Sequence, residues 1–261
     1  MLIEMNEDDL LGFAKDTVGS VVDDLKKNIY DHLEIRYKGK FDLYTQMDKR
    51  VESEIVRAIS ETLPEHDIIT EETDTVIGGS DQVWYIDPIS GSTNYAHGLP
   101  IYGVSLALKV RDKIKLGVIY NSIHDRLFYA ERDKGAYVGD VKMSVSEVEN
   151  IERSIVSTSF PYTKSGRNKN LEYFTKIAPK VEGVRRTGSV SVDLSYLALG
   201  FLDAFWAVGL ESWDTAAGLL LVEESGGSVS RVSGQKYDLE AESILVSNGK
   251  IHEDIVRILN G

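Results

Sequence analysis

The sequence contains no cysteine, which excludes disulfide bonds and thiolate chemistry. Its five histidines are scattered without a His-x3-His spacing, so no zinc centre is expected. The apolar runs fall far short of the roughly 20 residues that a membrane-spanning helix needs, and the first residues lack a basic segment followed by an apolar one. We therefore expect a soluble, cytoplasmic protein that does not enter a membrane.

Positive charge is also scarce, because 29 Lys and Arg residues stand against 42 Asp and Glu, for a net charge of −13. This balance disfavours a nucleic-acid-binding protein, whose affinity comes mainly from basic contacts to phosphate. An acidic surface still allows a small anionic substrate where metal ions or backbone amides supply positive potential. With 261 residues and 42% hydrophobic content, the chain can form one large domain or two subdomains.

Hydrophobic periodicity predicts different patterns in residues 1–148 and residues 149–261. In the first half, apolar spacings of three and four predict helices at 7–32 and 47–63, and short apolar runs predict strands at 66–70, 83–86, 104–110, 114–120, 126–130 and 136–138. The second half alternates strands at 155–157, 202–208, 229–232 and 243–246 with helices at 171–177, 192–199, 215–224 and 251–259. These patterns indicate an α+β half followed by a layered α/β half. No linker marks the boundary.

Acidic residues occupy the ends of predicted strands or the starts of predicted helices: Asp48, Glu71, Asp87 and Asp214. Carboxylate oxygens suit Mg²⁺, and paired Mg²⁺ ions activate water for displacement at phosphorus. Taken singly, Asp48 and Glu71 are more often solvated surface acids, and Asp214 is typical of a helix cap. Asp87 differs, because it follows the apolar run 83–86 and precedes a proline, so we expect it to be partly buried and to need a partner or a cation.

The turn after Asp87 reads Gly91-Ser92-Thr93-Asn94 and offers consecutive amides and hydroxyls. If a helix or turn begins there, its free N–H groups can bind an anion. An ordinary capped turn is an equally good interpretation of these residues alone.

Motifs along nearly the whole chain carry a common pattern: DLYTQMDKRVE, IITEET, WYIDPISGSTNYAHGLP, GVIYNSIHDRLFYAERDKGAYV, RRTGSVSVDLSYLALGFLDAFW and SWDTAAGLLLVEESGG. In this order they resemble the inositol monophosphatase family of Mg²⁺-dependent, lithium-sensitive phosphatases, whose superfamily includes fructose-1,6-bisphosphatase. The resemblance implies a layered α-β-α-β-α sandwich, a homodimer, two or three Mg²⁺ ions and inhibition by Li⁺.

The same resemblance implies a role for each matching residue. The metal ligands would be Glu71, Asp87 and the Ile89 carbonyl for the first ion, and Asp87, Ser90 and Asp214 for the second. The catalytic residues would be Asp48, Ser92 and Thr45, which activate a water molecule. The substrate contacts would come from Gly91, Ser92, Thr93, Gly188, Ser189 and Val190.

Ser90 departs from the family signature, which has an aspartate at this position. A neutral hydroxyl is a poor Mg²⁺ ligand, so we expect a weak second ion and greatly reduced turnover. Because the rest of the motif is intact, we interpret Ser90 as an engineered inactivating change rather than the mark of a natural pseudoenzyme. A catalytically dead relative that binds a phosphorylated ligand or a protein is the alternative.

The substrate-side segment also departs from the family pattern, because Ala207 stands where many members carry a glutamate that binds inositol. This favours a phosphorylated sugar such as fructose 1,6-bisphosphate alongside inositol monophosphate. The cations that could recognise a second phosphate are Lys164, Arg167, Arg185 and Arg186, although any one of them is more often a solvated surface charge. A 3′-phosphoadenosine 5′-phosphate phosphatase is the alternative within the class, and Asn94-Tyr95 disfavours it.

Overall fold

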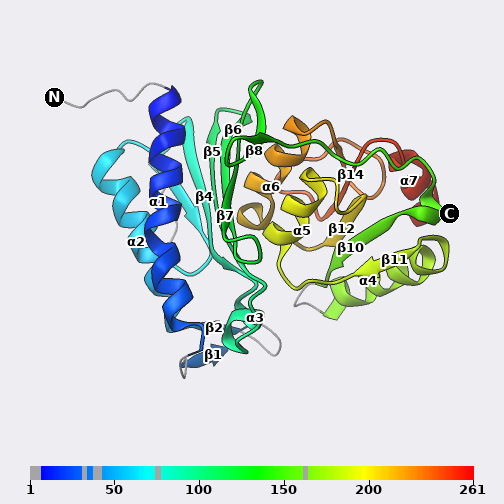
Figure 1. Ribbon diagram of the computed structural model, residues 1–261, viewed down its shortest axis with the longest axis horizontal. Helices are drawn as coiled ribbons and strands as arrows, with labels where there is room; N and C mark the ends of the chain where they lie inside the picture. The colour runs from blue at the N-terminus through cyan, green and yellow to red at the C-terminus, as the bar shows by residue number, and fades with distance from the viewer. Residues whose placement is uncertain (1–6, 31–33, 38–42, 74–77, 161–163) are drawn as a thin grey trace.

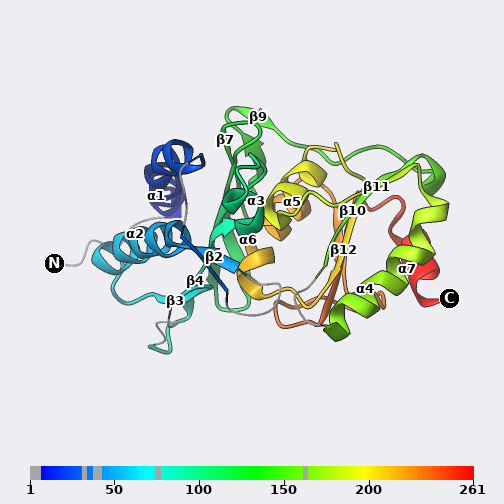
Figure 2. The same cartoon turned by 90° about the horizontal axis from the view of Figure 1, so that it is seen from below.

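The computed structural model describes residues 7–30, 34–37, 43–73, 78–160 and 164–261. It arranges them in five layers in the order helix, sheet, helix, sheet, helix (Figure 1 and Figure 2). The predicted α-β-α-β-α sandwich is confirmed.

The larger sheet has the strand order β3-β4-β5-β6-β7-β8-β9. Its strands are β3 (Asp67–Thr70), β4 (Gln82–Ser90), β5 (Gly103–Val110), β6 (Lys113–Asn121), β7 (Arg126–Glu131), β8 (Gly135–Val138) and β9 (Val141–Lys142). Among these, β3 and β4 run parallel, with Thr70 paired to Ile86, whereas the other neighbours are antiparallel. Glu71 directly follows Thr70, and Asp87 directly follows Ile86. The parallel register therefore places Glu71 and Asp87 at the same end of the sheet.

Two helices cover the outer face of this sheet, α1 (Glu7–Asn28) and α2 (Gln46–Thr62) (Figure 1). Their apolar faces form one core cluster with the strands, which includes Leu25, Ile55 and Trp84. The helix predicted to reach His32 ends at Asn28, and His32 lies outside the described residues. Two short strands, β1 (Ile35–Tyr37) and β2 (Leu43–Thr45), also pair antiparallel, which the periodicity did not predict.

The smaller sheet has the strand order β11-β10-β12-β14-β13. Its strands are β10 (Ile155–Ser159), β11 (Gly183–Arg185), β12 (Ala204–Val208), β13 (Ser228–Ser230) and β14 (Ser243–Ser247). The helices on its outer face are α4 (Lys164–Ile177) and α7 (His252–Asn260), with short 3₁₀ turns at Ile151–Arg153 and Ala178–Lys180 (Figure 2). Alternation of strands and helices in this half is therefore confirmed.

Two helices, α5 (Val190–Ala198) and α6 (Ser212–Glu224), fill the layer between the sheets (Figure 1). They lie in one apolar cluster with residues from both sheets, such as Tyr85 and Phe205. Packing is close here: a β-carbon on Gly117 of β6 would approach the Ala217 α-carbon to 2.9 Å, and one on Gly218 would approach the Leu194 β-carbon to 2.6 Å. The absence of a side chain at Gly117 lets α6 pack directly against the larger sheet, and its absence at Gly218 lets α6 pack directly against α5.

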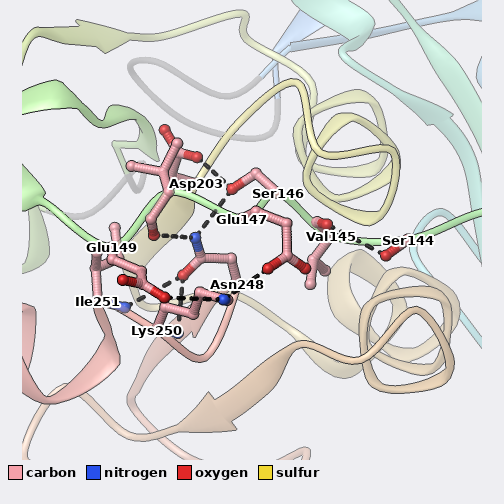
Figure 3. Close-up of polar contacts among 10 residues, drawn as sticks. Ser144, Val145, Ser146, Glu147, Glu149, Asp203, Asn248, Lys250 and Ile251 are labelled. Carbon is pink, nitrogen blue, oxygen red and sulfur yellow. Dashed lines mark hydrogen bonds and ion pairs between the residues drawn. The ribbon is translucent and has the colours of Figure 1, made fainter.

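The connector between the sheets, residues 143–150, is held by polar contacts to the smaller sheet (Figure 3). The Ser146 hydroxyl donates to Asp203, and the Asn248 amide donates to the Ser146 hydroxyl (2.9 Å) and the Val148 carbonyl (2.8 Å). The predicted boundary between the two halves falls inside this connector and stays a prediction. Among the described residues, no helix is long and apolar enough to cross a membrane.

Candidate active site

The end of β4 carries the motif that the sequence singled out. Its register against β5 shifts between Asp87 and Ser90, and Gly91 follows with a φ of 101°. A β-carbon at Gly91 would come within 3.2 Å of the Gly188 carbonyl oxygen. Glycine therefore satisfies both the left-handed backbone and the close approach of the two segments. The short helix α3 (Ser92–Ala96) begins directly after it.

The first turn of α2 brings the three predicted catalytic residues together. Thr45 caps this helix, and one oxygen of Asp48 accepts hydrogen bonds from the Thr45 N–H (2.8 Å) and the Thr45 hydroxyl (2.7 Å). The other oxygen accepts a hydrogen bond from the Ser92 hydroxyl at 2.5 Å. Burial raises the pKa of Asp48, and the hydrogen bonds from Ser92 and Thr45 act in the opposite direction. Asp48 is thus held in place and made more basic than an ordinary aspartate.

Asp87 lies at the centre of the acidic residues and is only 1% exposed. Burial raises its pKa well above the usual range, and the negative charges of Glu71 and Asp214 raise it further, whereas a hydrogen bond from Ser90 lowers it. Within the described part of the chain, its buried Oδ1 atom has no hydrogen-bond partner. The predicted burial is confirmed, and a buried carboxylate among like charges calls for a cation.

The sequence allowed Asp214 to be either a helix-capping acid or an acid of the metal site, and its position fits both. It lies in the first turn of α6, where its Oδ2 atom accepts a hydrogen bond from the Glu211 N–H at 2.8 Å. It also lines the same pocket as Glu71 and Asp87. The cap of the helix therefore fixes an acid that faces the pocket.

This pocket has a volume of about 560 Å³, within the range of roughly 300–1,000 Å³ typical of small-molecule sites. Its acidic residues are joined by the whole turn from Ile89 to Asn94. The other lining residues are Ser159, Phe160, Arg167, Arg186, Gly188, Val190, Gly209, Leu210, Glu211 and Trp213. The structure thus brings the predicted metal ligands and most of the predicted substrate contacts to one cavity.

Ser90, the departure from the expected signature, lies inside the site and is 4% exposed. Its hydroxyl oxygen accepts a hydrogen bond from the Ser191 N–H at 3.2 Å, at the start of α5. Position 90 therefore contributes a neutral oxygen where a carboxylate would add a negative charge.

The substrate-side segment reaches the pocket through Gly188 and Val190. Ser189 is 2% exposed and instead caps α5, because its hydroxyl accepts a hydrogen bond from the Val192 N–H at 3.4 Å. The side-chain amide of Asn94 holds this segment to the turn after β4 by donating to the Thr187 carbonyl at 2.9 Å. The predicted Ser189 contact would thus have to come from its backbone.

The predicted cations separate into two groups. Arg167 and Arg186 line the pocket, and the Arg186 guanidinium lies 5.9 Å from the centre of the Phe160 ring. Arg185 is exposed on β11, lies outside the pocket lining, and donates to the Val184 carbonyl at 3.2 Å. The side chain of Lys164 lies outside the described residues.

Sequence reasoning missed several lining residues. Glu211 and Trp213 adjoin Asp214, and their position beside a motif acid was the available signal. Phe160 and Leu210 carry no comparable signal, because each reaches the pocket from a loop after a strand of the smaller sheet. Ala207 is fully buried in the core between the sheets.

The donor atoms fit a hard divalent cation. They are oxygens, and one of them, Asp87 Oδ1, is buried without a partner among the described residues. Across the described ranges, no three His, Asp or Glu side chains are arranged to hold a metal ion by themselves. Besides the carboxylates, the pocket lining contains Ile89, with its backbone carbonyl, and Ser90, with a neutral hydroxyl that is a poorer ligand. Water could complete the coordination, because Mg²⁺ retains water ligands in proteins.

The fold and the pocket define a class of layered α/β protein with an oxygen-rich site suited to a cation and an anionic ligand. The model of the inositol monophosphatase family matches residues 6–261. An inositol-1-monophosphatase from Mesorhizobium japonicum is 36% identical over 228 residues, which cover 87% of this chain and 86% of that protein. The Nus factor SuhB of Pseudomonas aeruginosa is 35% identical over 226 residues, covering 84% of this chain and 83% of that protein.

Solved structures agree with the sequence comparisons. The inositol monophosphatase from Anabaena superposes with a TM-score of 0.88 at 30% identity, covering 98% of this chain and 97% of that one. This chain belongs to the inositol monophosphatase family, a family of phosphatases, and the predicted family membership is confirmed.

Proposed function

We propose that this chain hydrolyses phosphate monoesters in the pocket with Mg²⁺, the cofactor that the family uses in general. The observation that carries the proposal is the buried Asp87, whose charge is opposed by Glu71 and Asp214. The residues that would hold the ions are Glu71, Asp87 and the Ile89 carbonyl for one, and Asp87, Ser90 and Asp214 for the other. When bound, Mg²⁺ neutralises these acids, offsets the phosphate charge and makes water more acidic.

The protein supplies the base through Ser92 and Asp48. Ser92 lines the pocket, whereas Asp48 is fully buried behind it. Ser92 therefore accepts the proton of the attacking water and passes its own proton to Asp48 Oδ1, along the 2.5 Å hydrogen bond. The raised pKa of Asp48 favours this transfer, and Thr45 keeps the carboxylate oriented for it.

Turnover should be limited by Ser90. We expect Ser90→Asp to raise phosphate release at least tenfold, because it restores a carboxylate to the second ion site and one lost interaction with a charged group is worth about 1.5–3 kcal/mol. The assay is release of inorganic phosphate with Mg²⁺, using myo-inositol 1-phosphate, fructose 1,6-bisphosphate and 3′-phosphoadenosine 5′-phosphate. No gain with any of the three substrates would contradict the proposal.

For the substrate, we propose an inositol phosphate or a sugar bisphosphate, with Arg186 binding a second anionic group. In the Ser90→Asp background, Arg186→Ala should raise the KM for fructose 1,6-bisphosphate about tenfold or more and leave the KM for inositol 1-phosphate nearly unchanged. Arg185→Ala is the matched control, since this neighbouring arginine lies outside the pocket. Equal effects of the two substitutions would count against a second-anion site.

A binding role is the second candidate, and the neutral Ser90 together with relatives named as Nus factors favours it. In that case the chain would bind a phosphorylated ligand or a protein without turnover. Mg²⁺ calorimetry on this chain and on Ser90→Asp separates the candidates, because the enzyme should show a second ion and turnover only with the carboxylate. We also propose a homodimer that binds neither nucleic acid nor membrane, and light scattering checks the molar mass.

A further inference from the structure

Glu52 is a fully buried carboxylate that the proposed chemistry does not use. It lies on α2 one turn after Asp48 and is 0% exposed. Its Oε2 atom accepts hydrogen bonds from the Thr70 hydroxyl and from the Glu72 N–H (2.8 Å). Its Oε1 atom is buried and has no hydrogen-bond partner among the described residues.

A buried carboxylate of this kind is not expected to stabilise the core. Burying a charge is unfavourable unless its interactions compensate for the lost water, and an apolar side chain of similar size often serves stability equally well or better. Here both donors converge on Oε2, while Oε1 has no donor in the part of the chain that the structure describes. The arrangement points to a role other than stability.

The two groups that Glu52 holds lie on either side of Glu71. Thr70 is the last residue of β3 and 4% exposed, and Glu72 follows Glu71 directly. Fixing the side chain before Glu71 and the N–H after it restricts the backbone of the residue between them. Glu71 itself lines the pocket and raises the pKa of Asp87.

A second buried acid anchors the chain where it returns to the sheet. Asp67, at the start of β3, accepts hydrogen bonds from the N–H groups of Gly78 (2.6 Å), Gly79 (3.1 Å) and Ser80 (3.1 Å). Asp67 thus holds the chain at the start of β3, whereas Glu52 holds it at the end of β3, on either side of the pocket-lining Glu71. Glu52 does so from the same helix that carries the base Asp48.

We propose that Glu52 is a positioning residue that aims the Glu71 carboxylate at the cation site, an inference that rests on the proposed function. One oxygen of Glu52 fixes the turn from Thr70 to Glu72, so α2 places both the general base and a cation ligand. Residues that orient a metal ligand typically change metal affinity by roughly 10–100-fold when they are replaced.

The first test is Mg²⁺ calorimetry on variants of the Ser90→Asp protein. Glu52→Met, which removes the acceptor and keeps the volume, should weaken Mg²⁺ binding by roughly 10–100-fold. Thr70→Val should weaken it less, because the Glu72 N–H bond remains. Glu52→Gln retains an acceptor oxygen and should restore most of the affinity. Thr17→Val is the matched control, a buried threonine on α1 outside the pocket, and should change nothing.

The second test needs no metal. Hydrogen exchange of the Glu72 amide, measured by NMR on the metal-free protein, should accelerate in Glu52→Met and stay unchanged in Thr17→Val. Unaltered exchange at Glu72, or unaltered Mg²⁺ affinity in a folded Glu52→Met, would overturn the inference. If Glu52→Met fails to fold, Thr70→Val decides through the Mg²⁺ affinity alone, because the Glu72 N–H bond to Glu52 remains in that variant. Absence of Mg²⁺ binding in the Ser90→Asp protein itself would instead overturn the proposed function.

Discussion

Asp87 and Asp193 are both buried aspartates, but only Asp87 belongs to the acidic group that lines the pocket. Asp193 lies in the first turn of α5 and is 1% exposed. Burial raises the pKa of Asp193 well above its usual range, whereas a hydrogen bond from Thr187 and the charge of Arg186 lower it. The folded protein therefore binds a proton at Asp193 more readily than the unfolded chain does.

This property gives a pH dependence of stability. The contribution of Asp193 is fully present below the unfolded pKa of about 3.9, and it is lost as the pH rises through the higher folded pKa. We expect the unfolding free energy of Asp193→Asn to depend less on pH than that of the unmodified protein between pH 7 and pH 4. Urea unfolding at several pH values in metal-free buffer gives the slope of unfolding free energy against pH for each protein. Asp87 is present in both proteins and contributes equally to the two slopes. Identical slopes would show that Asp193 is not the titrating group.

For single residues, the sequence predicted those properties, such as burial, that depend on adjacent residues in the chain. Asp87 was expected to be buried because an apolar strand and a proline flank it, and it is. Glu52 was missed, because an acid in an amphipathic helix looks solvated and its burial results from tertiary packing. The contact of Asp48 with Ser92 joins residues 44 positions apart, so local pattern could not reveal it and only the family resemblance did.

At the scale of elements, long periodic segments were predictable and most of the shortest strands were not. The helix predicted at 47–63 is observed as Gln46–Thr62. The periodicity missed β1, β2, β9 and β11, which have two or three residues and are too short to show a period of two, and it found only β13 among the strands of that length. Helix α4 begins at Lys164 although apolar positions predicted only 171–177, because its first two turns, KSGRNKN, are polar.

The parallel pairing of β3 with β4 was also beyond local pattern. Strand direction depends on which elements pair across the sheet, and the two segments carry no signal for it. Yet this pairing places Glu71 beside Asp87. The candidate site was thus predictable in its list of acids, and its geometry follows from topology that only the family resemblance supplied.

At the scale of the whole molecule, the two halves share one interior. The cluster around α5 and α6 contains residues from both sheets, so neither sheet can expose its inner face without exposing the other. Trp84 lies in the core of the larger sheet and Trp206 in that of the smaller sheet. These residues provide separate reporters for the two halves.

We expect both halves to unfold in a single transition, because each loses the shared cluster on its inner face when the other unfolds. Two variants test this, one keeping only Trp84 and one keeping only Trp206, with the other tryptophans replaced by phenylalanine. Their fluorescence midpoints in urea should differ only by the stability change that calorimetry assigns to the substitutions. Two distinct transitions within one variant would show that residues 1–148 and 149–261 fold as separate domains.

The close approach at Gly117 and Gly218 restricts how this protein can diversify. Even a methyl group would push α6 away from the larger sheet at Gly117 or away from α5 at Gly218, and α6 carries Asp214 at its start. We therefore expect changes of substrate to come from pocket-lining residues on loops, such as Phe160 and Leu210. The close contacts of α6 require glycine to stay at positions 117 and 218.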